Sequence, residues 1–110
     1  EFDCPHCNEN EMDGEFLVML DMARSDAAVP FIINSGYRCA MHNAEVPNAS
    51  PTSSHIKGLA VDIKCTGSVA RFKILKALMD VGFDRIGVRK DFIHVDADKT
   101  KAAGVIWTYS

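Results

Sequence analysis

Apolar residues recur at helical spacing in two segments of the chain. In the first, Phe16, Leu20 and Ala23 share one face of a helix expected over residues 13–25, with Asp13 as its N-cap. The second helix is expected to begin with Ser68 as N-cap and to stop at Gly82. The residues expected on its buried side are Val69, Phe72, Leu75, Leu78 and Met79. The pattern therefore predicts two main helices.

Short apolar runs bounded by turn residues predict the strands. They lie at residues 31–34, 59–65, 85–88, 92–95 and 105–109. Only Arg89, Lys90 and Asp91 separate the third run from the fourth, which indicates a hairpin. The segments between the first two strands read as a turn at 35–38, a short helix near 39–45 and a loop at 46–54. Two helices and about five strands with hairpin-type connections predict an α+β fold with an antiparallel sheet.

Composition and charge narrow the class of protein. The chain has 110 residues, 47% of them hydrophobic and 25% charged, which is typical of a globular protein with a single domain over residues 1–110. The formal net charge of −3 argues against binding to nucleic acid, which requires a basic face. No apolar run approaches the roughly 20 residues of a membrane span. We expect a monomer that binds neither nucleic acid nor membranes.

Two of the predicted strands carry polar residues that a core strand does not need. In the strand at 59–65, alternation places Leu59, Val61 and Ile63 on one face and Asp62 on the other. From this strand alone, a solvent-facing Asp62 and a functional one are about equally favoured. The strand at 92–95 contains His94, and His55 precedes the Asp62 strand. Two histidines and an aspartate offer three protein ligands and leave one position open, which is the pattern of a catalytic zinc site.

Hydrolysis at such a site needs a base that accepts a proton from water. Asp91, three residues before His94, is the nearest candidate. Residues three apart in a regular strand point to opposite faces. We therefore expect the chain to turn or bulge at residues 90–92, with Asp91 in the hairpin tip.

The motifs resemble those of a known family. Ser-x-His-x-x-Gly-x-Ala-x-Asp at residues 53–62, Asp-x-x-His at 91–94 and Ser-Gly-Tyr-Arg at 35–38 are together similar to zinc D-alanyl-D-alanine carboxypeptidases. That family includes L-alanyl-D-glutamate endopeptidases of phage lysins and shares its fold with the hedgehog signalling domain. His-Val-Asp at 94–96 and the late Trp107 also match. The resemblance runs from about residue 31 to residue 107 and implies the hedgehog/DD-peptidase fold.

The resemblance also implies roles for individual residues. His55, Asp62 and His94 would bind Zn²⁺. Asp91 would act as general base and then as acid toward the leaving amine. Arg38 would hold a substrate carboxylate or polarise the carbonyl oxygen.

Further positions would support the site. Ser53 would line the substrate site or orient His55, and Gly58 would give the turn before the strand its freedom. Many relatives have an arginine shortly after His-Val-Asp, whereas this chain has Ala97 and Asp98. This reversal of charge leaves the details of the substrate open.

The function that the resemblance implies is zinc-dependent hydrolysis of peptidoglycan stem peptides. The protein would be a D-Ala-D-Ala carboxypeptidase or an endolysin-type endopeptidase, either exported by a bacterium or encoded by a phage. The alternative is a non-catalytic, zinc-stabilised binding module of the same fold. Such a module has no need of Asp91 or Arg38, so their presence favours the enzyme. A domain with incidental histidines would require three ligands and a base to coincide by chance.

The four cysteines have no assigned role. They are Cys4, Cys7, Cys39 and Cys65. The Cys-x-x-Cys spacing suits a second, structural zinc site, but disulfides are favoured in an exported protein and free thiols inside a cell. His6 is expected at the surface, and His42 is expected to pack or cap.

Overall fold

The computed structural model describes residue 2 and residues 12–36 and 54–109. The short helix predicted near 39–45, and the loop predicted at 46–54 apart from Ser54, lie outside the described residues.

Both predicted helices are present. Helix α1 spans Gly14–Ala27, and Asp13 caps it by accepting a hydrogen bond from the Phe16 backbone N–H at 2.9 Å, as predicted. Helix α3 spans Ser68–Asp80. Its N-cap is Gly67, and no side chain caps this end, so the prediction of Ser68 as N-cap was wrong by one residue. Gly82, with φ of 106°, follows the last turn as expected.

The predicted buried side of α3 was largely wrong. Val69 and Phe72 are 71% and 66% exposed, and Met79 is exposed as well. The residues that α3 buries are Ile74, Ala77 and Leu78. Helix α3 carries apolar residues on two adjoining stripes, so periodicity does not decide between them. Packing selects the stripe that contains the small Ala77, and of the predicted set only Leu78 is fully buried.

The strands form one sheet in the order β1-β2-β4-β3-β5. Their bounds are β1 Ile33–Ser35, β2 Ala60–Lys64, β3 Arg85–Val88, β4 Phe92–Asp96 and β5 Val105–Thr108. The α+β class and the β3–β4 hairpin are confirmed, and three of the four strand pairings are antiparallel. The pairing of β3 with β5 is parallel, which makes the sheet mixed. Strand β4 lies between β2 and β3, so neither of its edges is free for another strand. The chain that leaves β4 therefore places β5 along the free edge of β3, where β5 runs parallel to β3.

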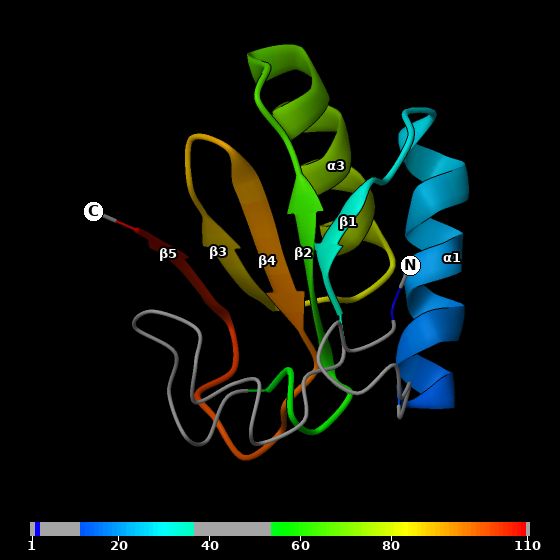
Figure 1. Ribbon diagram of the computed structural model, residues 1–110, viewed down its shortest axis with the longest axis vertical. Coiled ribbons are helices and arrows are strands. Elements are labelled where there is room, and N and C mark those ends of the chain that lie inside the picture. Colours follow the sequence, from blue (N-terminus) through cyan, green and yellow to red (C-terminus); the bar gives the residue numbers. More distant parts are fainter. Residues whose placement is uncertain (1, 3–11, 37–53, 110) are drawn as a thin grey trace.

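The two faces of the sheet differ in character. Helix α3 lies behind the sheet in Figure 1, and α1 runs beside it. The core packs against that face and includes Phe16, Leu20, Ile74 and Leu78 from the helices and Val61, Ile63, Ile86, Ile93 and Val95 from the strands. The opposite face, toward the viewer, carries the alternate residues of β2 and β4, among them Asp62 and His94. Neither α1 nor α3 is long and apolar enough to cross a membrane.

Candidate metal centre

His55 is held in a tight turn that leads into β2. Backbone N–H groups of Gly58 and Leu59 donate to the carbonyls of His55 and Ser54, at 3.3 and 3.1 Å. Gly58 has φ of 70°, a conformation that side chains disfavour, so the predicted role of this glycine in the turn is confirmed. His55 Nδ1 lies 2.8 Å from the Gly36 carbonyl oxygen. Because a carbonyl only accepts, Nδ1 carries the proton and Nε2 is left to face the site.

The register of the sheet brings the other two residues together. Asp62 on β2 and His94 on β4 are direct partners, and His94 Nδ1 lies 2.9 Å from Asp62 Oδ1. His55 Nε2 lies 3.3 Å from the same oxygen. One ligand atom from each of His55, Asp62 and His94 falls within 4.8 Å of the others. The three predicted ligands therefore form one cluster, although they are separated by up to 39 positions in the sequence.

The contacts within the cluster shift the pKa values of Asp62 and His94. Burial alone would raise the pKa of Asp62, but the interactions of its carboxylate with His55 and His94 outweigh the effect of burial and hold that pKa well below its usual range. Burial alone would lower the pKa of His94, whereas Asp62 and Asp96 on its two sides raise it above the usual value of 6.5. The ring nitrogens Nδ1 and Nε2 of His94 thus each face a carboxylate, Asp62 at 2.9 Å and Asp96 at 2.8 Å, which favours the protonated imidazole.

The donor set fits zinc. Two imidazoles and one carboxylate are ligands that zinc prefers, and three protein ligands leave a position for substrate or water. Metal-binding histidines usually donate their second ring N–H to a carbonyl or carboxylate. His55 does so to Gly36, and His94 Nε2 does so to Asp96 Oδ2 at 2.8 Å. His55 thus presents Nε2, and His94 presents Nδ1 once this nitrogen has lost its proton.

Asp96 orients His94 and is itself held in place. Its Oδ1 accepts hydrogen bonds from Arg85 Nε at 2.7 Å and from the Asp98 backbone N–H at 3.1 Å. The side chains of Asp96 and Arg85 are only 1% and 12% exposed. No role was predicted for Asp96, although it lies two residues after His94 and so shares its face of β4. Neither Arg85 nor the Gly36 carbonyl has a comparable sequence signal.

An aromatic side chain borders the centre on the β3–β5 side. Trp107 stands opposite Gly87, and its ring centroid lies 5.5 Å from that of His94. A Cβ added to Gly87 would lie 2.6 Å from the indole, so only glycine leaves room for Trp107 in this position. The Arg85 guanidinium lies 5.1 Å from the Trp107 ring centroid, within reach of a cation–π interaction. Gly87 therefore allows the indole to cover one side of His94.

Asp91 lies in the hairpin tip between β3 and β4, where the sequence placed it. The turn is closed by a hydrogen bond from Arg89 N–H to the Phe92 carbonyl at 3.0 Å. The Asp91 carboxylate is 55% exposed and lies 3.5 Å from the guanidinium of Arg89. The ligand atoms that lie within 4.8 Å of one another come from His55, Asp62 and His94, and the Asp91 carboxylate is not part of that group.

Other predicted site residues lie outside the described residues: Arg38, Ser53, Cys4, Cys7, Cys39, His6 and His42. Cys65, the one described cysteine, is a buried free thiol whose Sγ lies 3.8 Å from the Gly67 carbonyl oxygen.

Comparison with known proteins agrees with this chemistry. The family model described as Peptidase M15 matches residues 5–96, which include all three clustered ligands. A search of curated proteins finds no significant match. The matched region is most of the chain, and peptidases of this family are zinc-dependent. The chain therefore belongs to the peptidase M15 family of zinc metallopeptidases.

Proposed function

We propose that this protein is a zinc peptidase that hydrolyses peptide bonds in peptidoglycan stem peptides. The observation that carries the proposal is the cluster of His55, Asp62 and His94, whose ligand atoms lie within 4.8 Å of one another. Membership of a peptidase family implies a peptide substrate. The choice of stem peptides rests on the motifs at residues 35–38, 53–62 and 91–96, which are similar to those of D-Ala-D-Ala carboxypeptidases and endolysin endopeptidases. As such an enzyme, it acts on the cell wall, either exported by a bacterium or encoded by a phage.

A zinc ion at this centre would supply an electrophile that polarises the scissile carbonyl and makes water more acidic. Asp91 would accept the proton of the attacking water and return it to the leaving amine. For this its side chain must turn from Arg89 toward the cluster. Both side chains of the Arg89–Asp91 pair are about half exposed, and exposed pairs contribute little, so the reorientation is inexpensive.

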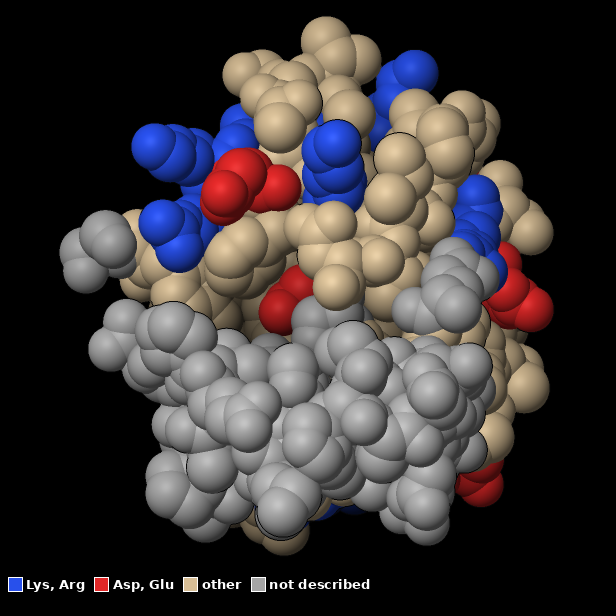
Figure 2. All heavy atoms as spheres, in the orientation of Figure 1, with Lys and Arg blue, Asp and Glu red and all other residues tan. Residues whose placement is uncertain are grey.

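The charge on the site face suits an anionic peptide. Lys64 lies two residues after Asp62 on β2, on the same face, and is exposed. Figure 2 shows Lys and Arg side chains over the upper part of this face, next to a hollow that contains an acidic side chain. Stem peptides carry free carboxylates, which such cations attract, and Arg38 would bind one of them directly.

Mass spectrometry of a purified muropeptide digest tests the proposal and identifies the bond. The zinc-loaded protein should cleave the stem peptide, a chelator should abolish cleavage, and added zinc should restore it. Loss of a terminal D-Ala would identify a carboxypeptidase, and cleavage within the stem would identify an endopeptidase. Muropeptides that stay intact with the zinc-loaded protein would contradict the proposal.

The role of Asp91 has a separate test. Asp91→Asn should lower turnover by about 10²- to 10⁴-fold, the usual contribution of a general base, and leave zinc affinity unchanged. Asp21→Asn, on the exposed surface of α1 with a side chain 78% exposed, is the matched control and should change neither quantity. Full activity of Asp91→Asn would rule out this residue as the base.

A further inference from the structure

The segment that follows β4 turns back against the turn that carries His55. Asp98, two residues beyond β4, accepts a hydrogen bond from Ser54 Oγ at 2.9 Å and pairs with Lys57 Nζ at 3.0 Å. Ser54 and Lys57 stand on the two sides of His55 in the sequence. The Asp98 carboxylate thus contacts the turn both before and after the histidine.

The Asp98 side chain is buried and is held by several hydrogen bonds. Its side chain is 1% exposed. Oδ1 also accepts from the backbone N–H and hydroxyl of Thr100, at 3.1 and 2.6 Å, and Lys101 Nζ lies 3.8 Å from Oδ2. Lys101 also donates to Ser54 Oγ at 3.0 Å, which closes a ring of contacts. Burial would raise the pKa of Asp98, but hydrogen bonds from Thr100, Lys57 and Ser54 hold it well below its usual range, so the carboxylate stays charged.

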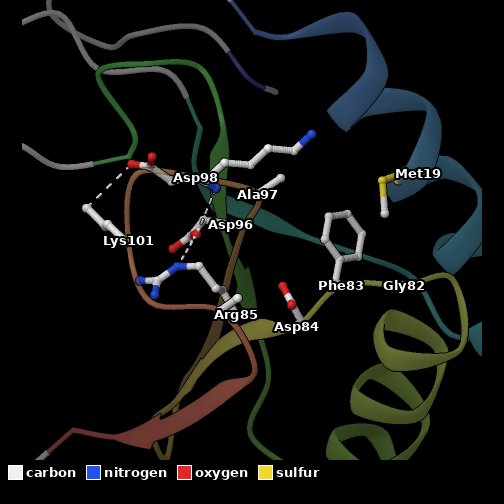
Figure 3. A pocket seen from close by; sticks show the side chains of 11 residues that line it. Met19, Gly82, Phe83, Asp84, Arg85, Asp96, Ala97, Asp98 and Lys101 are labelled. Atoms are coloured by element: carbon white, nitrogen blue, oxygen red, sulfur yellow. Dashed lines mark hydrogen bonds and ion pairs between the residues drawn. The ribbon is translucent and has the colours of Figure 1, made fainter.

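Asp98 is also tied to the residue that orients the other histidine. Its backbone N–H donates to Asp96 Oδ1, while Asp96 Oδ2 accepts from His94 Nε2. Ala97, between the two aspartates, donates its N–H to the Leu59 carbonyl at 3.0 Å. Figure 3 shows Asp96 and Asp98 on this segment, with dashed lines from Asp96 to Arg85 and from Asp98 to Lys101. Residues 96–98 therefore contact His94 through Asp96 and the turn that carries His55 through Asp98.

We propose that Asp98 is a positioning residue that holds the turn of residues 54–58 so that His55 presents Nε2 to the metal. This inference rests on the zinc site described above. Without the carboxylate, Ser54 and Lys57 lose their common partner, and the turn is free to move relative to β2 and β4. Asp98 is then part of the support of the metal centre, and its charge is neutralised by Lys57 and Lys101.

Zinc affinity of the metal-free protein tests this role without reference to activity. Competition with a chromophoric chelator should show that Asp98→Asn binds zinc about 10- to 100-fold more weakly than the wild type, the range found for residues that support metal ligands. The visible spectrum of the Co²⁺-substituted protein should change with it, because the position of one ligand changes. Asp80→Asn on α3, which removes an exposed pair with Lys76, is the matched control and should bind zinc within twofold of the wild type.

A double-mutant cycle separates positioning from general stabilisation. Lys57→Met should also weaken zinc binding, and the double variant with Asp98→Asn should lose less than the product of the two single losses, because both act through one contact. Urea denaturation of each metal-free variant shows how far the fold itself is weakened. A loss of stability with unchanged zinc affinity, or losses of zinc affinity that multiply, would overturn the inference.

The outcomes distinguish this inference from the site on which it rests. If the wild type fails to bind zinc, the metal centre itself is refuted, and this role of Asp98 with it. If the wild type binds zinc and Asp98→Asn binds it equally well, only the positioning role is refuted. If Asp98→Asn does not fold, Lys57→Met alone decides, since its side chain is 38% exposed and its replacement leaves the core intact.

Discussion

Asp96→Asn is the substitution for which the geometry makes the sharpest prediction. Asp96 accepts from His94 Nε2 through one oxygen and from Arg85 Nε and the Asp98 N–H through the other. An asparagine of the same shape has one acceptor oxygen and one donor NH₂. If the NH₂ faces His94, then Nε2 must accept, and the proton moves to Nδ1, the atom that faces Asp62. If the NH₂ faces Arg85 instead, it meets the donor groups of Arg85 and the Asp98 N–H, and these two groups lose their acceptor.

Both orientations weaken the metal centre, and the magnitude can be estimated. Loss of a partner that orients a metal ligand lowers affinity by about 10- to 100-fold, or roughly 1.4 to 2.7 kcal/mol. The fold is also weakened, because Arg85 and Asp96 form a buried pair with exposures of 12% and 1%. Removing one partner of such a pair costs about 3–5 kcal/mol. Arg85 keeps its hydrogen bond to the Ala102 carbonyl, so we expect about 3 kcal/mol.

Two measurements on the same preparation check these numbers. Chelator competition gives the zinc affinity, and urea denaturation of the metal-free protein gives the free energy of unfolding. Asp84→Asn, an exposed residue beside Arg85, is the control and should leave both quantities unchanged. Zinc affinity of Asp96→Asn within twofold of the wild type would refute the reasoning that Asp96 selects the tautomer of His94.

Three further predictions concern the surroundings of the site, the helix register and pH. Gly87→Ala places a Cβ 2.6 Å from the Trp107 indole, so it should cost about 1–3 kcal/mol in urea denaturation and shift the tryptophan emission; unchanged emission would contradict the close approach. Ile74→Ala should cost about 2–5 kcal/mol and Phe72→Ala less than about 0.5, since these side chains are 1% and 66% exposed; the reverse order would mean that α3 is rotated. The raised pKa of His94 means that its stabilisation of the metal-free protein is complete below about pH 6.5 and lost as pH rises through the folded-state pKa. Urea denaturation from about pH 5 to 9 should show this decline, and its persistence in His94→Gln would assign it to another group.

The residues that hold the candidate metal ligands in place, Asp96, Arg85 and Asp98, differ in how far the local sequence pattern could predict them. Alternation along β2 and β4 was enough to select Asp62 and His94, because facing in a strand depends only on neighbouring residues. The same alternation could have selected Asp96, which lies two residues after His94 on the same face of β4. It could not have selected Arg85 and Asp98, since their contacts join segments 11 and 44 residues apart. The buried stripe of α3 was misjudged for a related reason: two apolar stripes are equivalent until α1 and the sheet pack against one of them.

The sequence by itself determined the candidate ligand set, the α+β class, the N-cap at Asp13 and the hairpin around Asp91, all of which depend on residue chemistry or short-range spacing. Only the tertiary structure decided that Asp62 stands opposite His94, that the Gly36 carbonyl selects Nε2 of His55, and that β5 lies parallel to β3. These features depend on strand register and on backbone atoms from distant segments. No local pattern records them, because they arise when the whole chain buries its core and pairs its polar groups.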